Sequence, residues 1–112
     1  MIYLDHAATT PLHPRAYEAM LPWLKPEGEF GNPASSHAAG LRAAKAVGQA
    51  RAQVADLLGA QSAEILWTSG ATESNNLAIK GALEFRGLRG AHVVTARTEH
   101  KSVLDTCRHL ET

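Results

Sequence analysis

Residues 64–95 read EILWTSGATESNNLAIKGALEFRGLRGAHVVT, and this stretch decides the fold class. Its two ends, EILWT at 64–68 and AHVVT at 91–95, are short and apolar, which is typical of buried strands. The alanine- and leucine-bearing segment 72–85 between them has a helical pattern. A strand, a helix and a second strand in this order predict a parallel β-α-β unit with a right-handed crossover. The sequence therefore predicts an α/β fold.

The predicted sheet is incomplete. Parallel strands are normally covered on both faces and flanked by further strands, whereas this chain contains only two convincing ones. Its 112 residues leave room for one domain with a modest core. We therefore interpret the sequence as a piece of a larger α/β sheet.

The chain before this unit opens with a strand-like segment. Residues 2–14 predict a short strand that runs into a loop. Pro14 suits a first helical position, and the apolar residues after it recur at helical spacing, which predicts a helix to about Leu24. Residues 25–33 contain several glycine and proline residues and predict a loop.

Two more helices are expected. Ser35 or Ser36 is placed to cap a long alanine-rich helix, and Gly59 is placed to end it. A final helix is expected over 101–110. The long helix has an apolar side that needs a surface to pack against, and its members are Leu41, Ala44, Val47, Val54 and Leu58.

The composition argues against several classes of partner. Lys plus Arg and Asp plus Glu number 11 each, so the formal net charge is zero and no general field attracts nucleic acid or an anionic membrane. Nothing near Met1 resembles a basic leader followed by a long apolar run. We therefore expect a soluble, cytoplasmic protein with no direct nucleic-acid partner and no membrane association.

The cysteine and histidine content predicts no metal site. Cys107 is the single cysteine, and the six histidines are scattered along the chain. Cys107 falls within the last predicted helix and is interpreted as a small packing residue. A reactive thiolate needs exposure and a cationic neighbour, and Arg108 alone is weak support for one.

The segment 68–76 (TSGATESNN) follows one predicted strand and opens the next helix. Unpaired backbone N–H groups and small hydroxyl side chains meet there at the positive end of the helix dipole, which favours a phosphate site. Gly70 and Ala71 leave the backbone accessible, and Thr72 could both cap the helix and donate its hydroxyl to a phosphate oxygen. A plain helix cap explains the same residues equally well.

His100 follows the second predicted strand, at the sheet edge where open α/β sheets bind ligands, so we expect it to face the same crevice as Thr72. A neutral imidazole there could stack on a flat ring or pass protons near neutral pH. A purely structural histidine is the alternative. Lys101, flanked by Glu99 and Asp105, fits a solvated lysine better than a catalytic one.

Four segments together resemble the cysteine desulfurases of the class V aminotransferase group. They occur in the family's order and at appropriate spacing, and they cover nearly the whole chain. The segments are YLDHAATTP at 3–11, GNPASSH at 31–37, TSGATESNNLAIKG at 68–81 and TEHKSVLDTC at 98–107. The last segment is most similar to the housekeeping type that supplies sulfur for iron-sulfur cluster assembly and tRNA thiolation.

The resemblance implies a fold-type I transferase that depends on pyridoxal 5'-phosphate and is usually a homodimer. Residues 15–112 would be the first part of the cofactor-binding large domain, with the β-α-β unit and the long helix before it. Residues 1–14 would lie near the small domain and the substrate entrance. By this resemblance Ala71 and Thr72 hold the cofactor phosphate, and His100 is both catalytic and cofactor-binding, because it stacks on the pyridine ring and assists proton transfer.

The resemblance also implies what these residues lack. The family's Schiff-base lysine, its aspartate at the pyridine nitrogen and its sulfur-carrying cysteine match nothing here, so we expect these 112 residues alone to be inactive. The complete enzyme would act on L-cysteine and pass sulfur to an acceptor or scaffold protein. The alternatives are a selenocysteine lyase or cysteine sulfinate desulfinase on the same scaffold, and a non-catalytic module that binds a partner protein.

Overall fold

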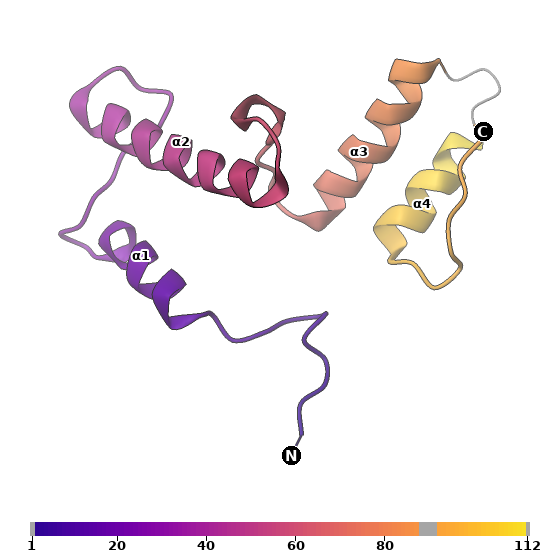
Figure 1. Cartoon of the computed structure of the whole chain (residues 1–112), viewed down its shortest axis with the longest axis horizontal. Helices are drawn as coiled ribbons and strands as arrows, with labels where there is room; N and C mark the ends of the chain where they lie inside the picture. The colour runs from indigo at the N-terminus through magenta and orange to yellow at the C-terminus, as the bar shows by residue number, and fades with distance from the viewer. Residues whose placement is uncertain (1, 88–91, 112) are drawn as a thin grey trace. The chain divides into compact units, whose positions relative to one another are not determined.

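The computed structural model of the chain describes residues 2–87 and 92–111. The chain divides into two compact units, Met1–Ile65 and Leu66–Thr112. The elements, in chain order, are α1 (Pro14–Leu24), α2 (Ala38–Leu58), the short 3-10 helix η1 (Ser62–Glu64), α3 (Ala71–Arg86) and α4 (Lys101–Leu110) (Figure 1).

The predicted β-α-β unit is absent from this structure. Its helix forms as α3, but residues 65–68 and 92–95 have no regular secondary structure, and residue 91 lies outside the described residues. The strand expected at the start of 2–14 is also absent. A strand is stabilised by backbone hydrogen bonds to a neighbouring strand. No segment within the described ranges pairs with these residues, so they remain irregular.

The first helix forms as predicted. α1 begins at Pro14 and ends at Leu24. Proline suits the first helical position because the N–H that it lacks would have no partner in the helix. The preceding His13 caps the helix, since its Nδ1 accepts the N–H of Arg15 at 3.2 Å.

The cap of the long helix differs from the prediction, whereas its end agrees. The N-cap of α2 is His37, whose Nδ1 accepts the N–H of Gly40 at 3.3 Å, so the predicted serine cap is wrong. Ser35 instead donates its N–H to the carbonyl of Asn32 at 2.9 Å and belongs to a turn. Gly59 ends the helix in the left-handed region, at φ 65°, where glycine carries no Cβ penalty.

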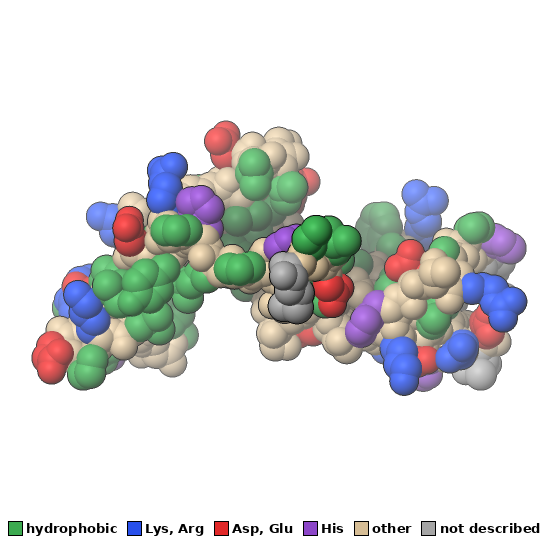
Figure 2. Space-filling view, turned by 90° about the horizontal axis from the view of Figure 1, so that it is seen from below, with side chains coloured by type: hydrophobic (Ala, Val, Ile, Leu, Met, Phe, Trp, Pro, Cys, Tyr) green, Lys and Arg blue, Asp and Glu red, His purple; other side chains and the backbone are tan. Residues whose placement is uncertain are grey.

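The core of the first unit is small. Among the described residues, the buried hydrophobic side chains are those of Ala43 and Ala55, both on α2. The predicted apolar side of α2 stays largely exposed, with Leu41 at 59% and Leu58 at 67%. Figure 2 shows hydrophobic side chains gathered on the surface of the part that carries α1 and α2. Exposed apolar surface of this kind is typical of a face that interacts with another surface.

In the second unit α3 and α4 lie side by side, with their amino-terminal ends at the same end of the pair (Figure 1). α4 spans Lys101–Leu110, as predicted. α3 begins at Ala71 with Gly70 as its N-cap, so Thr72 lies in the first turn and is not the predicted cap. This arrangement brings two helix amino termini, each with unpaired N–H groups and a positive dipole end, to one side of the unit.

Candidate functional site

A groove of about 350 Å³ lies between α3 and α4. It falls within the size range of small-molecule sites in proteins, and both helices contribute polar side chains to it. Its lining residues are Thr72, Asn76, Lys80, His100, Lys101, Ser102, Asp105, Thr106 and His109.

Helical spacing explains which side chains reach the groove. Thr72, Asn76 and Lys80 are four residues apart on α3 and therefore share one face. The lining residues of α4 with the same spacing are Lys101, Asp105 and His109. Two lysines and two helix amino termini outweigh the one carboxylate in the lining, Asp105, which favours an anionic ligand.

The loop before α3 is tied together by its own hydroxyl groups. The hydroxyl oxygens of Thr68 and Ser74 are 2.6 Å apart, and each lies 3.2 Å from the carbonyl oxygen of Gly70, so the two hydroxyl protons are shared among these three contacts. Glu73 accepts both the N–H of Ser69 at 2.7 Å and its hydroxyl at 2.6 Å. The hydroxyl of this segment that faces the groove is that of Thr72.

The two Ser69 bonds lower the pKa of Glu73 from its ordinary value of 4.5, the hydroxyl more than the backbone N–H. Because the pKa of this carboxyl is lowered in the folded protein, ionised Glu73 stabilises the folded loop at pH values above the ordinary pKa of glutamate. That contribution is lost as the pH falls through the lowered pKa.

We therefore expect an NMR titration of the Glu73 carboxyl carbon to give a midpoint below 4.5. Ser69→Ala removes the stronger bond and is expected to move the midpoint upward. Ser74→Ala is the matched control, because this serine bonds Thr68 and Gly70 instead and should leave the midpoint unchanged. A wild-type midpoint at or above 4.5 would contradict the assignment.

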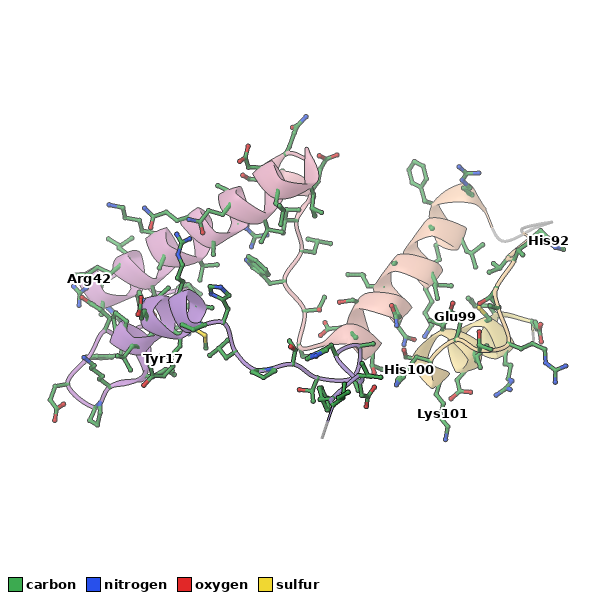
Figure 3. The ribbon with its side chains drawn as sticks, turned by 60° about the horizontal axis from the view of Figure 1, so that its bottom comes forward. Tyr17, Arg42, His92, Glu99, His100 and Lys101 are labelled. Carbon is green, nitrogen blue, oxygen red and sulfur yellow. The ribbon has the colours of Figure 1, made fainter. Side chains whose placement is uncertain are left out.

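The structure brings together two of the three residues that were predicted to form the site. Thr72 and His100 both line the groove, one from each helix. Ala71 is the exposed first residue of α3 and is not among the lining residues. Lys101 is exposed and opens α4 beside His100 (Figure 3).

His100 is held at the start of α4. It is the N-cap residue, and its Nδ1 accepts the N–H of Ser102 at 3.1 Å. Its ring is otherwise exposed, so a face is accessible to a flat ligand. Figure 3 shows it at the amino-terminal end of the helix, next to Glu99 and Lys101.

Sequence reasoning missed most of the residues in and around the groove. The spacing of Asn76 and Lys80 from Thr72 was the available signal, because all three must share a helix face. Asn75 and Ser102 gave no comparable signal, since they meet only through a hydrogen bond between α3 and α4, from Asn75 Nδ2 to Ser102 Oγ at 2.8 Å.

The described part of the chain contains neither a candidate metal site nor a candidate membrane-spanning helix. No group of three or more His, Cys, Asp or Glu side chains there could hold a metal ion. None of its helices combines the length and the apolar character needed to cross a membrane.

The family comparison decides the affiliation. The aminotransferase class V family matches residues 2–112. The chain belongs to this family. Three relatives named cysteine desulfurase IscS are similar over 111 residues: those of Psychromonas ingrahamii at 60% identity, Tolumonas auensis at 61% and Escherichia coli at 59%. In each case the match covers 98% of this chain and 28% of the relative, so the chain spans just over a quarter of their length.

The groove of this class V aminotransferase chain and the turn beside it carry groups of the kinds that a phosphate and a flat ring need. A phosphate needs several donors, and the first turn of α3 offers N–H groups that Gly70, having no side chain, does not cap. An added Cβ at Gly70 would meet nothing within 4 Å, so the space beside this turn is open. The Thr72 hydroxyl supplies a further donor, and the His100 ring supplies a flat surface on the opposite helix.

Proposed function

We propose that the chain is the amino-terminal portion of a cysteine desulfurase that depends on pyridoxal 5'-phosphate. The observation that carries the proposal is the identity of about 60% to proteins of that name across 98% of the chain. The complete enzyme would convert L-cysteine to L-alanine and deliver persulfide sulfur for iron-sulfur cluster assembly or tRNA thiolation.

The proposed roles of the site residues come from the family resemblance, and the positions of Thr72 and His100 in the groove support them. Ala71 and Thr72 would hold the phosphate through the first-turn N–H groups and the Thr72 hydroxyl, where the helix dipole favours a negative charge. His100 would lie against the pyridine ring and move a proton at its exposed edge. The cofactor, when bound, supplies an electron sink for the substrate's α-carbon.

The proposed fold of the complete protein is the α/β large domain of a fold-type I transferase. Segments 64–68 and 91–95 would become parallel strands once neighbouring strands supply hydrogen-bond partners. Residues 15–112 would form the first part of this domain, and residues 1–14 would lie near the small domain and the substrate entrance. The exposed apolar residues of α2, Leu41 and Leu58, would then be covered.

The proposed partners are L-cysteine, a second copy of the complete chain, and a sulfur acceptor or scaffold protein. Persulfide sulfur is reactive toward thiols and disulfides, and the cytoplasm keeps thiols reduced, so we propose a cytoplasmic enzyme. The 112 residues alone would be inactive, because no residue here matches the family's lysine, its aspartate at the ring nitrogen or its sulfur-carrying cysteine.

A substrate comparison tests the proposal. The complete protein is given pyridoxal phosphate, a thiol reductant and, separately, L-cysteine, L-selenocysteine or L-cysteine sulfinate. Release of L-alanine and sulfide with the highest kcat/KM for L-cysteine is expected. A higher kcat/KM for either rival would reassign the enzyme, and no reaction with all three would favour a module that binds a partner protein.

A further inference from the structure

A short hydrogen-bond relay connects α3 to the nitrogen of His100 that faces α4. Asn75 Nδ2 donates to Ser102 Oγ at 2.8 Å, and Ser102 Oγ lies 2.9 Å from His100 Nδ1. The backbone N–H of Ser102 donates to the same Nδ1 at 3.1 Å. Ser102, at the middle of the relay, is 8% exposed and shielded from competing water, whereas His100 at its end is exposed.

The chemistry of the groups fixes the direction of the relay. A backbone N–H only donates, so His100 Nδ1 must be an acceptor and carries no proton. The Ser102 hydroxyl, bonded to that same nitrogen, must then donate to it. Its oxygen is left to accept from Asn75, whose side-chain amide is the donor. A neutral His100 therefore carries its proton on Nε2.

We propose that Ser102, oriented by Asn75, is a positioning residue that holds His100 in the Nε2–H tautomer. Nδ1 is turned toward α4 and occupied, so Nε2, across the ring, is the nitrogen available to the groove. A histidine that transfers a proton must present a defined nitrogen, and a partner on the other nitrogen is how proteins set it. The functional part of this inference rests on the proposed function; the tautomer itself does not.

The direct test is the tautomer of His100 in the complete protein, labelled with ¹⁵N at histidine and studied both without cofactor and with pyridoxal phosphate. The His100 signal is assigned by its loss in His100→Gln. In the wild type, Nδ1 is expected to show the shift of an unprotonated nitrogen and Nε2 that of a protonated one. Ser102→Ala removes one of two donors, so the tautomer ratio should move by roughly two- to tenfold and the two shifts should approach each other.

Thr106→Val is the matched control. Thr106 is buried on the same helix and lines the same groove, but its hydroxyl donates to the Ser102 carbonyl at 2.7 Å and not to His100. This variant should leave both nitrogen shifts of His100 at their wild-type values. An equal change in Thr106→Val and Ser102→Ala would overturn the proposal, because the effect would then come from the helix as a whole.

Asn75→Asp tests the direction of the relay. A carboxylate only accepts, so it would turn the Ser102 hydroxyl away from His100 and reproduce the change seen in Ser102→Ala. When Asn75→Asp and Ser102→Ala are combined, the second substitution should change the tautomer ratio of His100 little further, because both act through the Ser102 hydroxyl. Wild-type shifts in Asn75→Asp, or an Nδ1–H tautomer in the wild type, would overturn the proposal.

Turnover separates this inference from the proposed function. Ser102→Ala is expected to lower kcat for L-cysteine by about two- to tenfold with KM unchanged, since it alters the proton-transferring group and not substrate binding. The expected tautomer change with no turnover in the wild type would overturn the proposed function and support the relay. Normal turnover with an unchanged tautomer in Ser102→Ala would overturn the relay and support the function.

Discussion

His100→Ala in the complete protein is expected to lower kcat for L-cysteine by about 10²- to 10⁴-fold, the usual contribution of a positioned acid-base group. The substitution removes the imidazole that lines the groove opposite Thr72, and with it a flat surface and a proton carrier. The visible absorption band of the bound cofactor should shift as well, because its ring loses a stacking neighbour. Steady-state kinetics and an absorption spectrum check both expectations.

Two further variants separate chemistry from folding. His100→Asn restores a side chain that is favoured at helix N-caps, so it should recover any stability lost with the cap of α4 without recovering the rate. His100→Phe keeps an aromatic ring but cannot carry a proton, so it should preserve more of the spectrum than of the rate. A wild-type rate and spectrum in His100→Ala would remove His100 from the site.

Thr72→Val is expected to weaken pyridoxal phosphate binding by about 10- to 150-fold, which corresponds to the roughly 1.5 to 3 kcal/mol of a hydrogen bond to a charged group. Valine keeps the size and branching of threonine and removes only the hydroxyl. The measurement is a cofactor titration of the apo protein, followed by the cofactor's fluorescence or absorption.

Thr72→Ser provides the control for this prediction. It keeps the hydroxyl at the start of α3 and should retain most of the affinity. Ser74→Ala removes a neighbouring hydroxyl that bonds Thr68 and Gly70, and it should leave the affinity near the wild-type value. Equal affinity in Thr72→Val and the wild type would contradict a phosphate site at this turn.

The helices were predictable because their signals are local. Pro14 marks the start of α1 and Gly59 the end of α2, and each acts through its own backbone geometry. The start of α2 was mispredicted because serine is a common N-cap residue, whereas here His37 caps the helix through Nδ1. Histidine plays the same part at the start of α1 and α4.

The strands were not predictable from their own residues. Segments 64–68 and 91–95 have suitable composition, but a strand forms only when another strand accepts and donates its backbone hydrogen bonds. That partner is a nonlocal feature, and the described residues do not supply it. Family membership supports the α/β expectation for the complete protein.

The site was predictable in part. Thr72 and His100 were expected to face one crevice, and both line the groove between α3 and α4. Their roles toward a cofactor stay predictions. The Asn75 to Ser102 bond joins residues that are 27 positions apart, so only the packing of the two helices reveals it.

Native mass spectrometry of the protein from its own source tests the central claim most directly, because it reports chain length, stoichiometry and bound cofactor together. We expect a chain several times longer than 112 residues, paired and carrying pyridoxal phosphate. A free 112-residue species without cofactor would leave the family membership intact and contradict the claim that these residues open a working desulfurase.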